Sequence, residues 1–164
     1  MNRVCVLVEE ATAEAREKYW DILTEVFNEV PPEQLREGMA RFGPETRFYT
    51  VEAAQVYLSV LFVTPVTIGE RVFGGIGGIC TRREYRGLGY GRIVLERALE
   101  ATSSTYGALL LWTRIPQYFA QFGFGEMPRV FVPDVGGSSP MLFSHDEESR
   151  SSVAALRDLP REYF

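Results

Sequence analysis

The chain has 164 residues, of which 46% are hydrophobic and 13% aromatic, and its 17 Lys and Arg against 22 Asp and Glu give a formal net charge of −5. This length and apolar content predict a folded chain with a sizeable core and exclude a disordered protein. The acidic balance argues against a nucleic-acid partner, because the phosphate backbone attracts basic surfaces.

The small number of cysteine and histidine residues narrows the possible classes of protein further. Cys5 and Cys80 lie far apart in strand-like runs, so we expect reduced core thiols and a cytoplasmic location. His145 is the only histidine, which disfavours a metal site and a Ser-His-Asp triad. The first residues lack a basic and then apolar signal, and no apolar run approaches about 20 residues, so we expect neither a signal peptide nor a membrane partner.

The first half of the chain shows short alternating apolar runs, two stretches of helical periodicity and tight connections. Sequential strands joined by tight turns predict an antiparallel sheet. The expected elements are strands at 4–8, 47–51, 56–66 and 71–81, an amphipathic helix from 19 to 30 that Pro31-Pro32 stops, and a shorter helix at 33–42.

The second half alternates helices with strands. The run 108–112 is fully apolar, which is typical of a central strand. We expect helices at 89–103, 116–121 and 149–159, a strand at 129–135 and a loop at 136–140, with Gly123 ending the second of these helices. No repeat or long linker divides the chain, so residues 1–164 are expected to form one α/β domain.

The segment Arg86-Gly87-Leu88-Gly89-Tyr90-Gly91 lies between a predicted strand and a predicted helix. Glycines let the backbone approach a ligand closely, and their N–H groups can converge on an anion. The first turn of the next helix adds its own N–H groups and the positive end of its dipole. A pyrophosphate suits this arrangement, and Arg86 and Arg92 can add charge-assisted contacts.

Three phosphate-binding patterns compete for this loop. A dinucleotide fingerprint needs a third glycine where Arg92 stands, and a P-loop needs a lysine that the segment lacks. The remaining pattern, Arg-x-x-Gly-x-Gly at Arg86, Gly89 and Gly91, resembles the acetyl-CoA loop of the GCN5-related N-acetyltransferases (the GNAT superfamily). The alternative is a glycine-rich turn that only precedes a helix.

Two neighbouring segments strengthen this resemblance. The strand 71–81 contains Gly74, Gly75, Gly77 and Gly78, and glycine inside a strand marks a bulge or a ligand against the backbone. The segment 118–124 resembles the second signature of the superfamily, an aromatic residue four positions before Gly-Phe. The resemblance implies a central, mostly antiparallel mixed sheet flanked by helices, with acetyl-CoA as the cofactor. The implied cofactor-binding residues are Ile79, Cys80, Thr81, Arg86, Gly87, Leu88, Gly89, Tyr90, Gly91, Arg92 and Phe119.

One position departs from the pattern of the superfamily. Many members carry a tyrosine, the general acid for the CoA thiolate, where this chain has Phe119, and its tyrosine is the neighbouring Tyr118. A shift of one residue turns a side chain by about 100° around a helix. Tyr118 is therefore either the catalytic acid or a residue that packs beside CoA. No general base is assigned, because the strands 71–81 and 108–112 contain no acidic residue.

The resemblance implies an N-acetyltransferase that transfers an acetyl group from acetyl-CoA to a primary amine, with a small molecule as the preferred acceptor. A protein or peptide N-acetyltransferase and a non-catalytic acyl-CoA-binding module are the alternatives. A homodimer is left open as the assembly.

Overall fold

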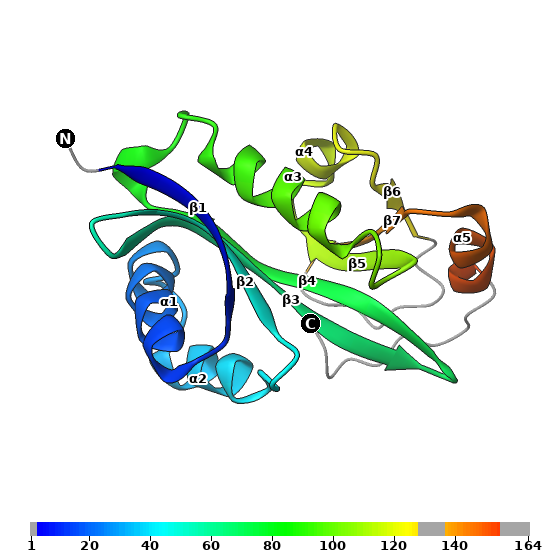
Figure 1. Cartoon of the computed structure of the whole chain (residues 1–164), viewed down its shortest axis with the longest axis horizontal. Helices are drawn as coiled ribbons and strands as arrows, with labels where there is room; N and C mark the ends of the chain where they lie inside the picture. The colour runs from blue at the N-terminus through cyan, green and yellow to red at the C-terminus, as the bar shows by residue number, and fades with distance from the viewer. Residues whose placement is uncertain (1–2, 128–136, 155–164) are drawn as a thin grey trace. The chain divides into compact units, whose positions relative to one another are not determined.

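The computed structural model describes residues 3–127 and 137–154, and these form a seven-stranded sheet with flanking helices (Figure 1). The strand order is β1-β2-β3-β4-β5-β7-β6. The pairs β1–β2, β2–β3, β5–β7 and β6–β7 are antiparallel, whereas β4 and β5 are parallel. The predicted mixed, mostly antiparallel sheet is therefore confirmed. The elements are β1 Val4–Glu10, α1 Ala13–Val26, α2 Pro32–Ala40, β2 Arg47–Ala53, β3 Val56–Ile68, β4 Arg71–Thr81, the 3-10 turn η1 Arg83–Tyr85, α3 Tyr90–Thr102, β5 Ala108–Thr113, α4 Pro116–Ala120, β6 Gly125–Glu126, β7 Ser139–Ser144 and α5 Glu147–Ala154.

The chain forms two compact units. The first contains the described residues up to Thr64 together with Gly78–Glu100, and the second contains Pro65–Gly77 and the described residues from Ala101 onward. Strands β3 and β4 therefore contribute to both units. Each unit has its own hydrophobic cluster.

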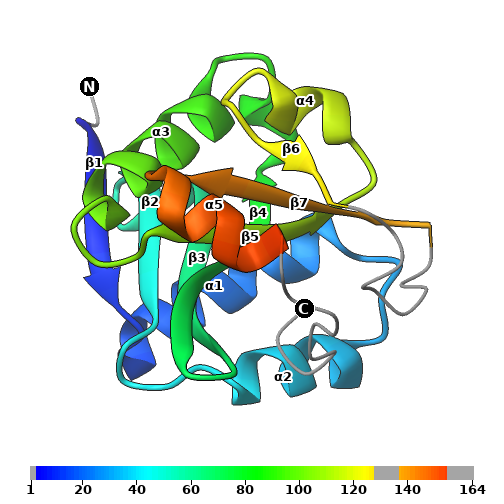
Figure 2. The same ribbon diagram turned by 90° about the vertical axis from the view of Figure 1, so that its right-hand side faces the viewer.

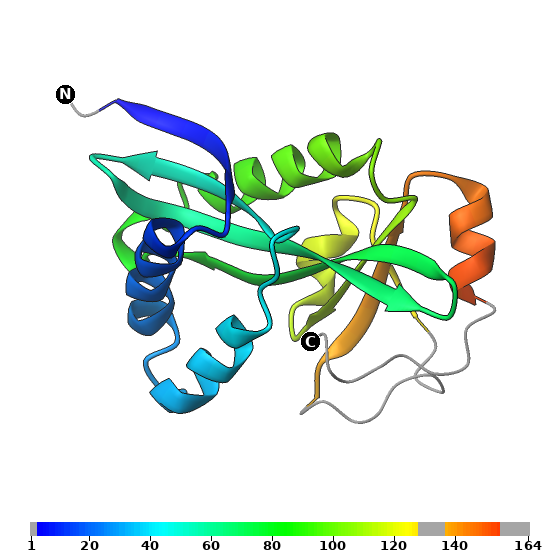
Figure 3. The same ribbon diagram turned by 60° about the horizontal axis from the view of Figure 1, so that its bottom comes forward.

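The core of the first unit lies between the helices α1 and α2 and one face of the sheet. The apolar face of α1 buries Tyr19, Ile22 and Leu23 against Phe48 of β2 and against residues of β3 and β4. Aromatic rings dominate this cluster, and the Tyr19 and Phe48 ring centroids are 5.0 Å apart. Figures 1 and 3 show α3 on the opposite face of these strands.

The second unit is built around β5, which pairs with β4 on one side and β7 on the other. This central position explains why its residues Ala108–Leu111 are at most 3% exposed, as a fully apolar strand predicts. Figure 2 shows β7 beside β5, followed by α5. The cluster comprises Val66, Ile68, Phe73, Ala108, Leu110 and Met127.

Several sequence-based assignments were wrong. Helix α1 spans Ala13–Val26 rather than residues 19–30, since Thr12 caps its start and Phe27 leaves helical geometry at φ −106° and ψ 41°. Strand β7 begins at Ser139, inside the segment predicted as a loop, and the short strand β6 was not predicted. The strand predicted at 129–135 lies outside the described residues, as does the part of the predicted helix 149–159 beyond residue 154.

Candidate acyl-CoA site

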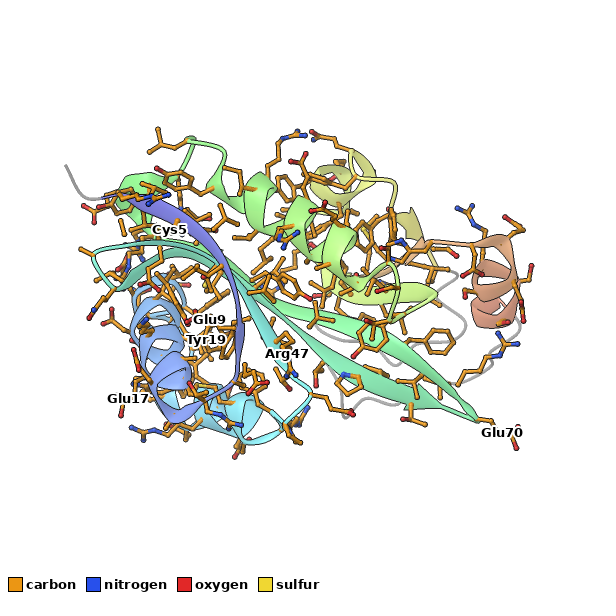
Figure 4. All side chains as sticks on the ribbon, in the orientation of Figure 1. Cys5, Glu9, Glu17, Tyr19, Arg47 and Glu70 are labelled. Carbon is orange, nitrogen blue, oxygen red and sulfur yellow. The ribbon has the colours of Figure 1, made fainter. Side chains whose placement is uncertain are left out.

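Strand β4 carries the first geometric signature of the candidate site. Gly78 adopts a φ of +56°, which interrupts the extended conformation of β4. A Cβ atom at Gly78 would lie 1.9 Å from the hydroxyl oxygen of Tyr19 and 2.9 Å from Cε1 of Phe62. Figure 4 shows Tyr19 on α1. The glycine is therefore required both by backbone conformation and by the close approach of a buried tyrosine.

The next residues of β4 are held by side-chain bonds from β3. Ser59 donates its hydroxyl to the carbonyl oxygen of Cys80 at 3.1 Å and shares a hydrogen bond of 2.8 Å with the hydroxyl of Thr81. Burial raises the pKa of the Cys80 thiol to about 12. This thiol is therefore protonated at neutral pH and is not an activated nucleophile.

The glycine loop has the backbone conformation that an anion-binding loop requires. Gly87 and Gly89 adopt φ angles of +78° and +83°, and no atom lies within 4 Å of the place that a Cβ atom would take on either residue. Conformation, and not lack of space, therefore selects glycine at both positions.

The loop leads directly into α3. The N–H of Ile93 donates to the carbonyl oxygen of Gly89 at 3.1 Å, and this hydrogen bond closes the first turn of the helix. Helix geometry leaves the N–H groups of this turn without intrahelical acceptors, and the positive end of the helix dipole lies there. Such a turn suits a phosphate group.

Two arginines flank the loop with exposed guanidinium groups. Arg86 donates its Nε to the carbonyl oxygen of Thr81 at 3.2 Å, which ties the start of the loop to the end of β4. Arg92 forms an ion pair of 3.3 Å with Glu96 one turn further along α3. Both arginines are exposed residues beside the glycines.

A third arginine, Arg82, was not predicted from the sequence to belong to the site. Its guanidinium donates to the main-chain oxygen of Tyr57 at 2.8 Å and forms ion pairs with Asp21 and Glu25 of α1. These partners lie 25, 61 and 57 positions away in the sequence. No local pattern could have revealed this cluster.

The predicted site residues fall into both units. Ile79, Cys80, Thr81 and the whole loop from Arg86 to Arg92 lie in the first unit, whereas Tyr118 and Phe119 lie on α4 in the second. Phe119 is only 2% exposed, and its ring packs against those of Tyr118 and Phe124. Tyr118 is half-buried. The roles of these two aromatic residues stay predictions.

Two partly buried carboxylates in the first unit already have partners. Glu52 has a side chain that is only 12% exposed and is paired with Lys18 at 3.2 Å. Burial lowers the pKa of Lys18, but the hydrogen bond and the charge of Glu52 outweigh it, so the net pKa is raised. The carboxylate of Glu9 accepts a hydrogen bond of 2.5 Å from Tyr57. Both carboxylates are therefore held in place by partners within the first unit.

The described part of the chain shows neither a metal site nor a membrane-spanning helix. Residues 3–127 and 137–154 contain no group of three or more His, Cys, Asp or Glu arranged to hold a metal ion. Within the same ranges, no helix combines the length and the apolar character needed to cross a membrane.

The fold is shared with acyltransferases of several bacteria. GNAT-family N-acetyltransferase YhbS from Escherichia coli, solved in complex with CoA, aligns with a TM-score of 0.75 at 13% identity, over 98% of this chain and 93% of that chain. An acyl-CoA N-acyltransferase from Pseudomonas aeruginosa aligns with a TM-score of 0.71 at 20% identity, over 87% of this chain and 100% of that chain. No curated protein matches the sequence.

The sequence itself matches the family model described as "Acetyltransferase (GNAT) family" over residues 12–124. This match covers more than half of the chain and includes strand β4, the glycine loop, α3 and α4. The chain belongs to the GNAT family of acetyltransferases.

Proposed function

We propose that this protein is an N-acetyltransferase that uses acetyl-CoA and a primary amine, with a small molecule as the acceptor. One observation carries the proposal: Gly87 and Gly89 turn the chain through positive φ angles directly before α3, beside the exposed Arg86. This combination of a glycine loop, a helix N-terminus and a cation suits a pyrophosphate.

In this proposal the first turn of α3 and the loop N–H groups bind the pyrophosphate, and Arg86 and Arg92 contribute charge-assisted contacts. Main-chain groups of Ile79, Cys80 and Thr81 bind the pantetheine arm. Acetyl-CoA, when bound, supplies an acyl group already activated as a thioester. Phe119 is proposed to contact CoA from α4.

The chemistry that the chain must supply is positioning and proton handling. Alignment of the amine with the thioester carbonyl can contribute about 7–11 kcal/mol to lowering the barrier. We propose a main-chain N–H near Ile79 as the hydrogen-bond donor to the carbonyl oxygen of the acyl group. Tyr118 is the proposed donor of a proton to the CoA sulfur, and its half-buried ring supports this role because a catalytic acid must be reachable.

The absence of acidic residues from β4 and β5 favours one rival, a non-catalytic acyl-CoA-binding module. A direct test is release of the CoA thiol, followed with a thiol-reactive chromophore, from acetyl-CoA in the presence of polyamines, amino acids, aminoglycosides and short peptides. Amine-dependent release from small amines supports the proposal. Release only with peptides selects the protein N-acetyltransferase. Tight acetyl-CoA binding without release for any amine selects the binding module.

The same assay should include longer acyl-CoA donors, since we propose acetyl-CoA as the preferred donor.

We also propose that residues 1–164 act as one catalytic domain in a reducing, cytoplasmic compartment. The free thiols of Cys5 and Cys80 support this compartment. A homodimer is the proposed assembly, because β1 lies at one edge of the sheet and exposes Val4, Val6 and Val8 by 40–46%.

A further inference from the structure

Arg82 stands where strand β4 ends and the connection to the glycine loop begins. Its guanidinium reaches three acceptors: Nε donates to the main-chain oxygen of Tyr57 at 2.8 Å, and the two terminal nitrogens form ion pairs with Glu25 and Asp21 of α1. Only 11% of its side chain is exposed. One side chain therefore joins the end of β4 to both β3 and α1.

The main chain around Arg82 also forms hydrogen bonds to β3 and α1. The N–H of Arg82 donates to the carbonyl oxygen of Leu58 at 3.0 Å, and the N–H of Arg83 donates to the carboxylate of Glu25 at 3.3 Å. Glu25 thus binds a guanidinium and the neighbouring backbone at once. The first residues after β4 are held by both backbone and charge-assisted bonds, and the charge-assisted ones are stronger than neutral ones.

The electrostatics of this cluster separate Arg82 from the other arginines near the loop. Burial lowers the pKa of Arg82, but the hydrogen bonds and charges of Asp21 and Glu25 outweigh it, so the net pKa is raised and the group stays ionised. Its charge is balanced by two carboxylates. Arg86 and Arg92, in contrast, expose their guanidinium groups to solvent.

The geometry points to Arg82 as a positioning residue, an anchor that holds the pyrophosphate loop in its binding conformation through α1 and is not itself a phosphate ligand. This inference rests on the proposed function of the loop. Gly87 and Gly89 have wide conformational freedom, so a loop that becomes ordered only when CoA binds loses entropy on binding. This loss lowers the affinity for CoA. A loop fixed at its entrance has lost part of that freedom before CoA binds.

The two possible roles of Arg82 predict opposite effects when its carboxylate partners are neutralised. The double variant Asp21→Asn/Glu25→Gln removes two negative charges and frees the guanidinium. If Arg82 is a phosphate ligand, CoA binding should become stronger. If Arg82 is an anchor, CoA binding should become about tenfold weaker, although the protein has lost charges that repel CoA.

Four further variants complete this set: two at Arg82 and two controls. Arg82→Gln should weaken CoA binding about tenfold, and Arg82→Lys should restore only part of it, since an ammonium group cannot reach three acceptors in fork geometry. Arg83→Gln removes the same charge from an exposed neighbour and should change the affinity less than threefold. Glu17→Gln/Glu29→Gln removes two exposed carboxylates near the same helix and should not weaken binding.

Calorimetric titration with CoA measures these affinities. Amide hydrogen exchange of the unliganded protein independently measures how firmly the segment after β4 is held. Loss of the anchor should raise exchange at least tenfold at the hydrogen-bonded amides of residues 82–86, while the middle of α3 keeps its protection. Tighter CoA binding by Asp21→Asn/Glu25→Gln, or unchanged exchange at 82–86 in Arg82→Gln, would overturn the inference. If the unaltered protein binds no CoA, the proposed function fails, and the exchange result still decides whether Arg82 anchors the loop.

Discussion

Replacement of Gly78 by alanine should destabilise the protein much more than the loss of a glycine ordinarily does. At a φ of +56°, the left-handed conformation costs a non-glycine residue about 1–2 kcal/mol. The new methyl group would also lie 1.9 Å from the hydroxyl oxygen of Tyr19 and 2.9 Å from Phe62. Tyr19 is only 2% exposed, so it cannot swing into solvent. Overpacking of this kind adds about 1–3 kcal/mol, which gives a total of about 2–5 kcal/mol.

Gly69 provides the matched control for this substitution. It has a similar φ of +63°, but no atom lies within 4 Å of the place that a Cβ atom would take there. Gly69→Ala should therefore cost only the backbone contribution of about 1–2 kcal/mol. The difference between the two alanine variants isolates the steric effect of Tyr19 and Phe62 at Gly78.

Urea denaturation, followed by tryptophan fluorescence and by circular dichroism, measures the free energy of unfolding of each variant. Tyr19→Phe removes the atom closest to the new methyl group, so the double variant Tyr19→Phe/Gly78→Ala should recover about 1 kcal/mol or more in a double-mutant cycle. Equal losses of stability for Gly78→Ala and Gly69→Ala would refute the reasoning, as would a cycle without coupling.

Two further predictions concern catalysis and pH. If Tyr118 is the general acid, Tyr118→Phe should lower kcat at least tenfold without changing CoA affinity, whereas unaltered steady-state turnover would assign the ring a packing role. Burial lowers the pKa of His145, an effect that Asp146 only partly offsets. The unfolded chain therefore binds more protons, and stability should decline as the pH falls below about 6.5. His145→Gln should flatten this decline in Tm measured between about pH 7.5 and 5, and an unchanged slope would show that other groups cause it.

The sequence predicted most of the first unit because its signals are local. Strand β4 has the predicted bounds Arg71–Thr81, and α2 and α3 lie within one or two residues of prediction. The C-terminal end of helix α1 was predicted too far along the chain, since the apolar spacing continues past Val26. The hydroxyl of Thr24 donates to the carbonyl oxygen of Trp20 at 2.9 Å, a competing bond that weakens the helix near its end.

The errors in the second unit have a different cause. Strand β7 begins with Ser139 and Pro140, residues that favour loops, yet Pro140 lies opposite Trp112 of β5. Its pairing partners are about 30 positions away in the sequence, and a pattern confined to neighbouring residues cannot reveal them. Tertiary contacts decided this element, as they did the cluster around Arg82.

The candidate site was predictable to the extent that it depends on glycine. Gly87 and Gly89 stand at positive φ, as the loop pattern requires, and Gly78 interrupts a strand whose glycines were expected to mark a bulge or a ligand against the backbone. The buried pairing of Glu52 with Lys18 was not predictable, because its partner lies on α1, 34 positions away. Local conformation is encoded in residue type, whereas ion pairs depend on the completed fold.

Calorimetric titration of the unaltered protein and of Gly89→Glu with acetyl-CoA and CoA tests whether the glycine loop binds the cofactor. We expect micromolar binding by the unaltered protein. We expect no measurable binding by a folded Gly89→Glu variant, because a carboxylate would enter an anion site at a residue whose φ of +83° already requires glycine. Circular dichroism checks that the variant is folded. Equal affinity of the two proteins, or no binding by the unaltered protein, would contradict the assignment of the loop as the acetyl-CoA site.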